Sequence, residues 1–203
     1  MAITETSPTR SAFLELREER QVVREGFEFL DEKRVILAKE MIGRLKAYEA
    51  LRKTYRDRHR QAVVAMARAL GRHGLDELEV YPPARLNEFK LETREQPFLG
   101  VTLIDGSTRL AAGPGQPAVN PSPEARSCIQ HFADLVRLGL DMAVQRACLE
   151  RLIDEYIRTE RRARALENVV LPEISEALEF INEQLEAVDQ EEAIRVRTAR
   201  QND

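Results

Sequence analysis

The sequence predicts an all-α dominated fold, a long antiparallel two-helix coiled coil formed by the N- and C-terminal arms, with a small loop or β-hairpin head in the middle. Three observations support this prediction. Of the 203 residues, 33% are charged and only 5% are aromatic, which is typical of long helices. Seven of the nine prolines lie between residues 82 and 123. The arms on either side carry apolar residues at seven-residue spacing.

The first arm, residues 9–72, repeats one heptad pattern eight times. Such a narrow apolar stripe is typical of a coiled-coil seam. Twelve of the sixteen stripe positions are apolar and the other four are arginine, whose stem packs while its charged head reaches water. Thr9 or Ser11 is expected to cap the start of the helix. The stripe consists of Phe13, Leu16, Arg20, Val23, Phe27, Leu30, Arg34, Leu37, Met41, Arg44, Tyr48, Leu51, Tyr55, Arg58, Ala62 and Ala65.

The second arm, residues 124–198, carries a stripe in two registers. Pro123 and Glu124 suit its start, because proline is tolerated in the first turn of a helix. After Pro172 the stripe is offset by about four residues, which predicts a stutter with a kink at the proline. The first register holds Leu138, Met142, Leu149, Leu152, Tyr156, Ala163, Leu166 and Val170; the second holds Ile174, Leu178, Ile181, Leu185 and Val188.

Neither arm can bury its stripe alone, so the chain is expected to fold back and pair the two. At 1.5 Å per residue each arm is about 90–110 Å long, more than the diameter of a compact domain of this size. Eight acidic residues and no Lys or Arg lie between Pro172 and Ile194. Antiparallel pairing brings them near the basic start of the first arm, although a merely solvated charge run is the alternative.

The head, residues 73–123, is predicted to hold a short helix, a β-hairpin or meander and a loop. Residues 75–81 precede Pro82 and Pro83, and residues 89–93 and 98–104 have extended character. Residues 112–117 are expected to form a loop because of their glycines and prolines. Two or three strands are not stable alone in water, so this head must pack on the helices or on a partner.

Composition and motifs exclude several classes of function. The net charge of −4 argues against a nucleic-acid binder, and no apolar run reaches the roughly 18–20 residues of a membrane span. The N-terminus lacks a signal-peptide pattern, so a cytoplasmic location is the default expectation. Cys128 and Cys148 lie about 30 Å apart on one predicted helix, too far for a disulfide, and are expected to be small buried hydrophobic residues.

We expect no catalytic residue, cofactor site or metal site. The three histidines stand apart from any cluster with ligand spacing, and residues 113–115 lack the Lys-Ser/Thr of a phosphate loop. The basic stretches 52–60 and 158–164 are interpreted as helix surface or as a docking face for an acidic protein, in preference to phosphate contacts.

Three segments resemble the D subunit of the V-type/A-type rotary ATPases. They are Gly26–Leu37, which contains Leu-Asp-Glu-Lys-Arg; Gly100–Leu103; and Arg161–Pro172, followed by the acidic stretch. The resemblance extends over the whole chain. It implies a non-catalytic central-stalk component that couples ATP hydrolysis or synthesis to proton or sodium transport by rotation.

The resemblance also implies partners and a place in the complex. The partners are the catalytic A and B subunits, the F subunit and a funnel-shaped coupling subunit (C or d), with no nucleic acid and no direct membrane insertion. The location is the soluble sector, peripheral to the membrane. The arms, about residues 10–35 and 172–198, are expected to face the A/B hexamer. The head, about residues 75–120, is expected to lie near the F subunit and the membrane-side coupling subunit. The candidate hexamer-facing residues are Arg10, Arg17, Arg20, Arg24, Ile181, Leu185, Arg195 and Arg197, and the partner-facing ones are Phe89, Phe98, Val101 and Leu103.

Two other classes fit the sequence less well. A generic structural coiled-coil scaffold, such as a homodimer, explains the heptads but not the paired motifs. An enzyme or regulator with a helical core needs convergent polar groups in the middle of the chain, and the sequence offers none.

Overall fold

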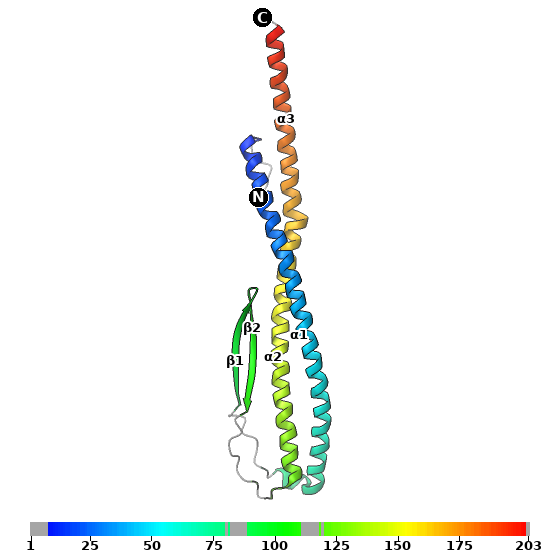
Figure 1. The fold of residues 1–203 in the computed structure, drawn as a ribbon. Coiled ribbons are helices and arrows are strands. Elements are labelled where there is room, and N and C mark those ends of the chain that lie inside the picture. Colours follow the sequence, from blue (N-terminus) through cyan, green and yellow to red (C-terminus); the bar gives the residue numbers. More distant parts are fainter. Residues whose placement is uncertain (1–7, 80, 82–88, 111–117, 119, 202–203) are drawn as a thin grey trace. The chain divides into compact units, whose positions relative to one another are not determined.

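A computed structural model of the chain describes residues 8–79, 81, 89–110, 118 and 120–201. Within these residues six elements follow one another (Figure 1): helix α1 (Arg10–Glu79), strands β1 (Phe89–Phe98) and β2 (Val101–Leu110), helix α2 (Pro123–Ala165), the π-helical turn η3 (Leu166–Val170) and helix α3 (Leu171–Gln201). The loop predicted over residues 112–117 lies outside the residues that the structure describes. The predicted fold class is confirmed, because a long N-terminal helix and a long C-terminal helical arm flank a two-stranded hairpin.

The chain divides into two compact units. Unit 1 comprises Met1–Ile36 and Tyr156–Asp203, and unit 2 comprises Leu37–Glu155. Helix α1 contributes to both units, and so does α2. Each unit is described here by itself.

In unit 1 the start of α1 packs antiparallel to the C-terminal helical arm. Arg10 pairs with Asp189 at 3.0 Å, and a Cβ added at Gly26 would lie 3.9 Å from Leu166. From the first contact to the second, the residue number increases on α1 and decreases on the other arm. The two helices therefore run antiparallel. The core of the unit consists of Ala12, Thr159, Ala163, Ile174, Ala177, Leu178 and Ile181.

In unit 2 the rest of α1 packs antiparallel to α2. The contacts run from Arg44 with Gln145, through Cys128 Sγ 3.6 Å from Met66 Sδ, to Arg72 with Glu124. Small residues allow the two backbones to approach closely at the end of the pair. The buried residues here include Ala62, Ala65, Ala69, Ala125 and Cys128, and farther along α2 Leu135, Cys148 and Leu152.

Burial follows the two predicted stripes. On α1 every stripe position is buried or half-buried except Arg20 and Arg58, which are exposed. On the C-terminal arm the single exposed stripe position is Val188. Both exposed arginines occupy positions where a long charged side chain reaches water, as the sequence indicated.

The ends of α1 are set by local chemistry. Thr9 caps the start, because its Oγ1 accepts the Ala12 N–H at 3.2 Å and its carbonyl accepts the Phe13 N–H. Gly74 has φ 73° and ψ 175°, so α1 is interrupted there and residues 75–79 form a short helical extension. Glycine suits this left-handed φ, because a Cβ would be strained.

The irregularity expected at Pro172 lies in η3, just before the proline. Pro172 has no N–H, so the carbonyl four residues earlier loses its α-helical donor. The Leu171 N–H bonds to the Leu166 oxygen instead, an i to i+5 bond that inserts one extra residue into the helical repeat. The helix therefore continues through Pro172 while the register of its apolar stripe changes.

The hairpin has longer strands than the sequence predicted. The prediction of one extended segment over residues 98–104 is wrong, because Leu99 and Gly100 form the two-residue turn and Phe98 pairs with Val101. Both turn residues have positive φ, 48° and 84°, as a type I′ turn requires. Leucine is unfavourable there, and nothing in its residue type predicts the turn.

Candidate functional site

The candidate arm residues all lie in unit 1, but their exposure differs. Arg17, Arg20 and Arg24 are exposed, and so are Arg195 and Arg197. Arg10 is engaged with Asp189, although both side chains remain largely exposed. Ile181 is 2% exposed and Leu185 is half-buried, so these two side chains belong to the core of unit 1. Whether any of them contacts a hexamer stays a prediction.

Unit 1 also presents apolar side chains that the sequence reading did not select. They lie outside the heptad stripe, on helices whose buried face is already filled. A signal was available, since these large apolar residues fall out of register with the stripe. The exposed residues of this kind on α1 are Leu14, Val22, Phe29, Val35 and Ile36, and those on the C-terminal arm are Ile157, Val169, Phe180, Ile194 and Val196. Val188 is exposed as well, although it belongs to the stripe.

The candidate head residues are divided between surface and interior. Val101 and Leu103, on one face of β2, are 7% and 3% exposed. Phe98 is half-buried, and Phe89 is the first residue of β1, with its side chain outside the described part. Among the hairpin residues whose burial is described, the exposed ones are Thr93–Pro97 of β1, the turn residues Leu99 and Gly100, and Thr102 of β2. A partner can reach Val101 and Leu103 only if they leave their present packing.

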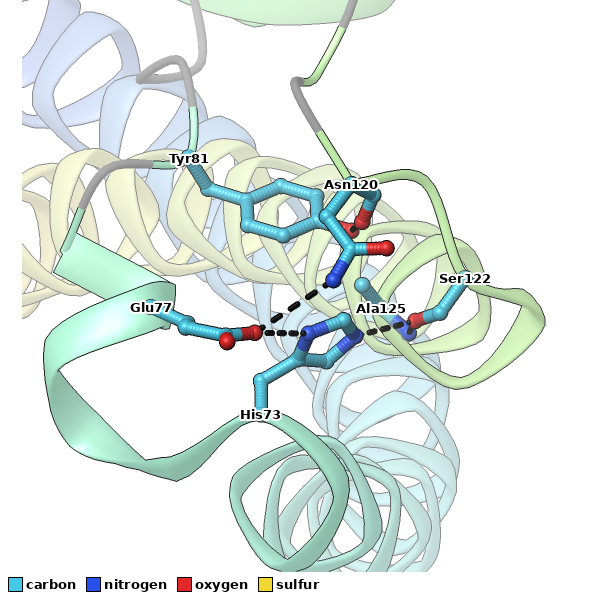
Figure 2. A network of polar contacts seen from close by, with 6 residues as sticks. All are labelled: His73, Glu77, Tyr81, Asn120, Ser122 and Ala125. Atoms are coloured by element: carbon cyan, nitrogen blue, oxygen red, sulfur yellow. Dashed lines mark hydrogen bonds and ion pairs between the residues drawn. The ribbon is translucent and has the colours of Figure 1, made fainter.

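In unit 2 a network of polar contacts joins the end of α1 to the start of α2 (Figure 2). We call it the clasp and define it as His73, Glu77 and Ser122 with Tyr81 and Asn120. The His73 side chain is 2% exposed, with Nδ1 3.1 Å from Glu77 Oε2 and Nε2 2.6 Å from Ser122 Oγ. Its ring meets Tyr81 edge-on at 5.6 Å. The Tyr81 hydroxyl donates to the Asn120 carbonyl, and the Asn120 amide donates to Glu77.

The clasp fixes the histidine tautomer and caps α2. The Glu77 carboxylate only accepts, so in neutral His73 the proton is on Nδ1 and Nε2 accepts from the Ser122 hydroxyl. Ser122 Oγ in turn accepts the Ala125 N–H at 3.1 Å, which makes it the N-cap of α2.

The order Glu77–His73–Ser122 has the connectivity of a hydrolase triad, but the environment is structural. Ser122 is 5% exposed, and its oxygen already holds the α2 N-cap bond. A nucleophile needs an approach for substrate and donors for an oxyanion, and Ser122 is enclosed by its own helix start. We therefore interpret the clasp as a device that joins two helix ends.

An open groove of about 570 Å³ lies beside the clasp, between α1 and α2. Its basic lining residues are Arg60, Arg68 and His131, so part of the predicted basic stretch 52–60 faces it. Glu124 also lines it, with Oε1 3.3 Å from Arg72 and Oε2 buried without a hydrogen-bond partner among the described residues.

The two cysteines are free and buried, as predicted. Burial raises the pKa of the Cys128 thiol, because the thiolate is poorly solvated beside the alanines of α1. Within the described ranges no group of three or more potential metal ligands occurs, and no helix is long and apolar enough to cross a membrane.

Comparison with known proteins identifies the family. The family model for the ATP synthase D subunit matches residues 12–201. The chain belongs to the ATP synthase D-subunit family. The resemblance stated from the sequence is thereby confirmed.

Relatives within this family align with the chain over nearly its whole length. The A-type ATP synthase D subunit of Methanoregula boonei is 28% identical over 97% of this chain and 96% of its own. The V-type ATP synthase D subunit of Thermus thermophilus is 28% identical over 96% and 87%. The A-type D subunit of Thermococcus gammatolerans is 25% identical over 94% and 91%. The similarity therefore includes both arms and the head.

Proposed function

We propose that the chain is the central-stalk rotor subunit of an A/V-type ATPase and couples ATP hydrolysis or synthesis to proton or sodium translocation by rotation. The observation that carries this proposal is the match to the D-subunit family over residues 12–201. The antiparallel helix pairing within each unit supports it, since paired helices resist bending more than a single helix. The chain itself contributes no catalytic group in this proposal.

The proposed partners are the catalytic A and B subunits, the F subunit and the funnel-shaped coupling subunit (C or d). Unit 1 is proposed to face the A/B hexamer through its exposed residues. Phe29, Phe180 and Val188, between 55% and 64% exposed, offer apolar contact there. The acidic residues of α3 and the arginines of α1 add charge of both signs. A rotor biases each catalytic site only through contacts that differ between the conformations of that site.

The head is proposed to lie near the F subunit and the coupling subunit. The chain as a whole is proposed to belong to the soluble sector of the complex, peripheral to the membrane. We propose the exposed strand segment Thr93–Pro97 and the basic groove of unit 2 as surfaces for such partners.

Reconstitution tests the proposal directly. The tagged chain is combined with the A, B and F subunits of the same organism, and subunit ratios and ATPase-driven rotation of a bead on this chain are measured. Threefold excess of A and B over this chain, with rotation in steps of about 120°, is expected from three catalytic sites around one rotor. Failure to join the hexamer, together with a concentration-dependent mass of the chain alone, would replace the rotor with a homomeric scaffold.

A further inference from the structure

The hairpin is attached to α2 through hydrogen bonds to two residues of β2, Thr102 and Ile104. The Cys148 thiol lies against both backbone groups of Ile104, accepting its N–H at 3.3 Å and donating to its carbonyl at 3.0 Å. One helical turn farther along, Arg151 Nη1 donates to the Thr102 carbonyl at 2.7 Å. Val101 and Leu103, which precede and separate these two positions, are buried. The described anchor therefore consists of the hydrogen bonds to Thr102 and Ile104.

The backbone hydrogen bonds between β1 and β2, the ladder of the hairpin, use other groups than this anchor. In an antiparallel pair, the N–H and C=O of a residue point to the same side, and that side alternates along the strand. Ile104 directs both groups toward Cys148, so its cross-strand partner Glu95 directs both away from β2. Pro97 lies two residues from Glu95, so its backbone groups also point away from β2. The N–H that proline lacks would therefore not have bonded to β2. The hairpin can leave α2 without breaking its own hydrogen bonds.

The anchor is made of weak and partly exposed contacts. A thiol is a weak donor and a weak acceptor, and the Arg151 side chain that donates to Thr102 is exposed. Thr93–Pro97 on β1 are all exposed. A segment held by few and weak hydrogen bonds, one of them exposed to solvent, opens locally at a lower free energy than the core.

We propose that the hairpin is a strap that detaches from α2 and docks again as a unit, with Cys148 and Arg151 as its latch. In the docked state Cys148 is 0% exposed and Val101 and Leu103 are covered. In the detached state all three are accessible. A two-stranded hairpin is only marginally stable in water, so the detached state is a minor one. The inference concerns the chain alone and does not depend on the rotor function.

Thiol labelling of the full chain tests the strap, because both cysteines lie in unit 2. Two single-cysteine variants are compared, Cys128→Ala, which keeps Cys148, and Cys148→Ala, which keeps Cys128. The reagent is an aryl disulfide: the thiolate forms a mixed disulfide with one half of the reagent, and the other half leaves as one coloured aryl thiolate. Rates are measured against urea, because the raised pKa of Cys128 makes absolute rates unequal.

We expect Cys148 labelling to be nearly independent of urea below the unfolding transition, and Cys128 labelling to rise steeply with it. Arg151→Ala should speed Cys148 labelling about tenfold, the effect of losing one charged hydrogen bond from the docked state. Arg146→Ala is the matched control, because Arg146 is on the same helix and pairs with Glu150 rather than with the hairpin, and it should leave the rate unchanged. Equal urea slopes for the two cysteines would overturn the proposal.

Hydrogen exchange gives a second readout that needs no substitution. The Ile104 amide is bonded to Cys148, whereas the ladder alternation directs the neighbouring Leu103 amide to β1. Detachment as a unit frees the first and not the second, so Ile104 should exchange at least about tenfold faster than Leu103. Equal exchange of the two amides would show that the hairpin opens only by unfolding.

Discussion

In the clasp, the Ser122 hydroxyl bonds two buried partners, the His73 ring and the Ala125 N–H at the start of α2. Replacing Ser122 with alanine removes the N-cap of α2, which costs about 1 kcal/mol. It also leaves the buried Nε2 of His73 without a partner, which costs about 1–3 kcal/mol. Ser122→Ala should therefore lower the free energy of unfolding of unit 2 by about 2–4 kcal/mol.

The matched control is five residues farther along the same helix. Ser127 is half-buried, and the structure shows no hydrogen bond from its hydroxyl to any described residue. Ser127→Ala should change stability by less than about 0.5 kcal/mol, in the stabilising direction, since alanine favours a helix interior. Ser122→Gly isolates the histidine contribution, because glycine at an N-cap costs only a few tenths of a kcal/mol.

Urea unfolding followed by circular dichroism measures the stability, and hydrogen exchange of the Ala125 amide reports the cap locally. Ser122→Gly should fall between Ser122→Ala and the control. If Ser122→Ala and Ser127→Ala differed by less than about 0.5 kcal/mol, the double role assigned to this hydroxyl would be wrong.

The remaining predictions concern the arms and the second thiol. Ile181→Ala should lower the free energy of unfolding, measured by heat or urea, by about 2–4 kcal/mol, because the Ile181 side chain is 2% exposed. Phe180 is 55% exposed, so Phe180→Ala should leave the stability of the isolated chain nearly unchanged and weaken its assembly with the hexamer. A larger loss of stability in Phe180→Ala than in Ile181→Ala would contradict the core assignment. Pro172→Ala should restore α-helical bonding through η3, and an unchanged helix curvature and ATPase coupling in the reconstituted complex would remove any role for that turn. Because burial raises the pKa of Cys128, the unfolded chain releases this proton first, so stability should fall as pH rises above about 8.5, and Cys128→Ala should flatten that part of the pH–stability curve.

Much of the fold can be predicted from the sequence, because it depends on the spacing of apolar residues and on the positions of the prolines. Seven-residue spacing fixes which face of each helix is buried, whatever the partner, and the prolines between residues 82 and 123 fix where the helices stop. The Thr9 cap and the irregularity beside Pro172 follow from single residues whose effect on backbone hydrogen bonds is local. Family membership is also carried by local runs, such as Arg161–Pro172.

The tertiary structure decides what depends on residues far apart in the chain. His73 and Ser122 are 49 positions apart, and Cys148 and Ile104 are 44 apart, so no spacing rule brings either pair together. Val101 and Leu103 have the residue types of a partner surface, and only the folded structure shows that they are buried. Burial is a property of neighbours rather than of residue type. The seam of this protein can therefore be determined from its sequence, whereas the clasp and the latch require the folded chain.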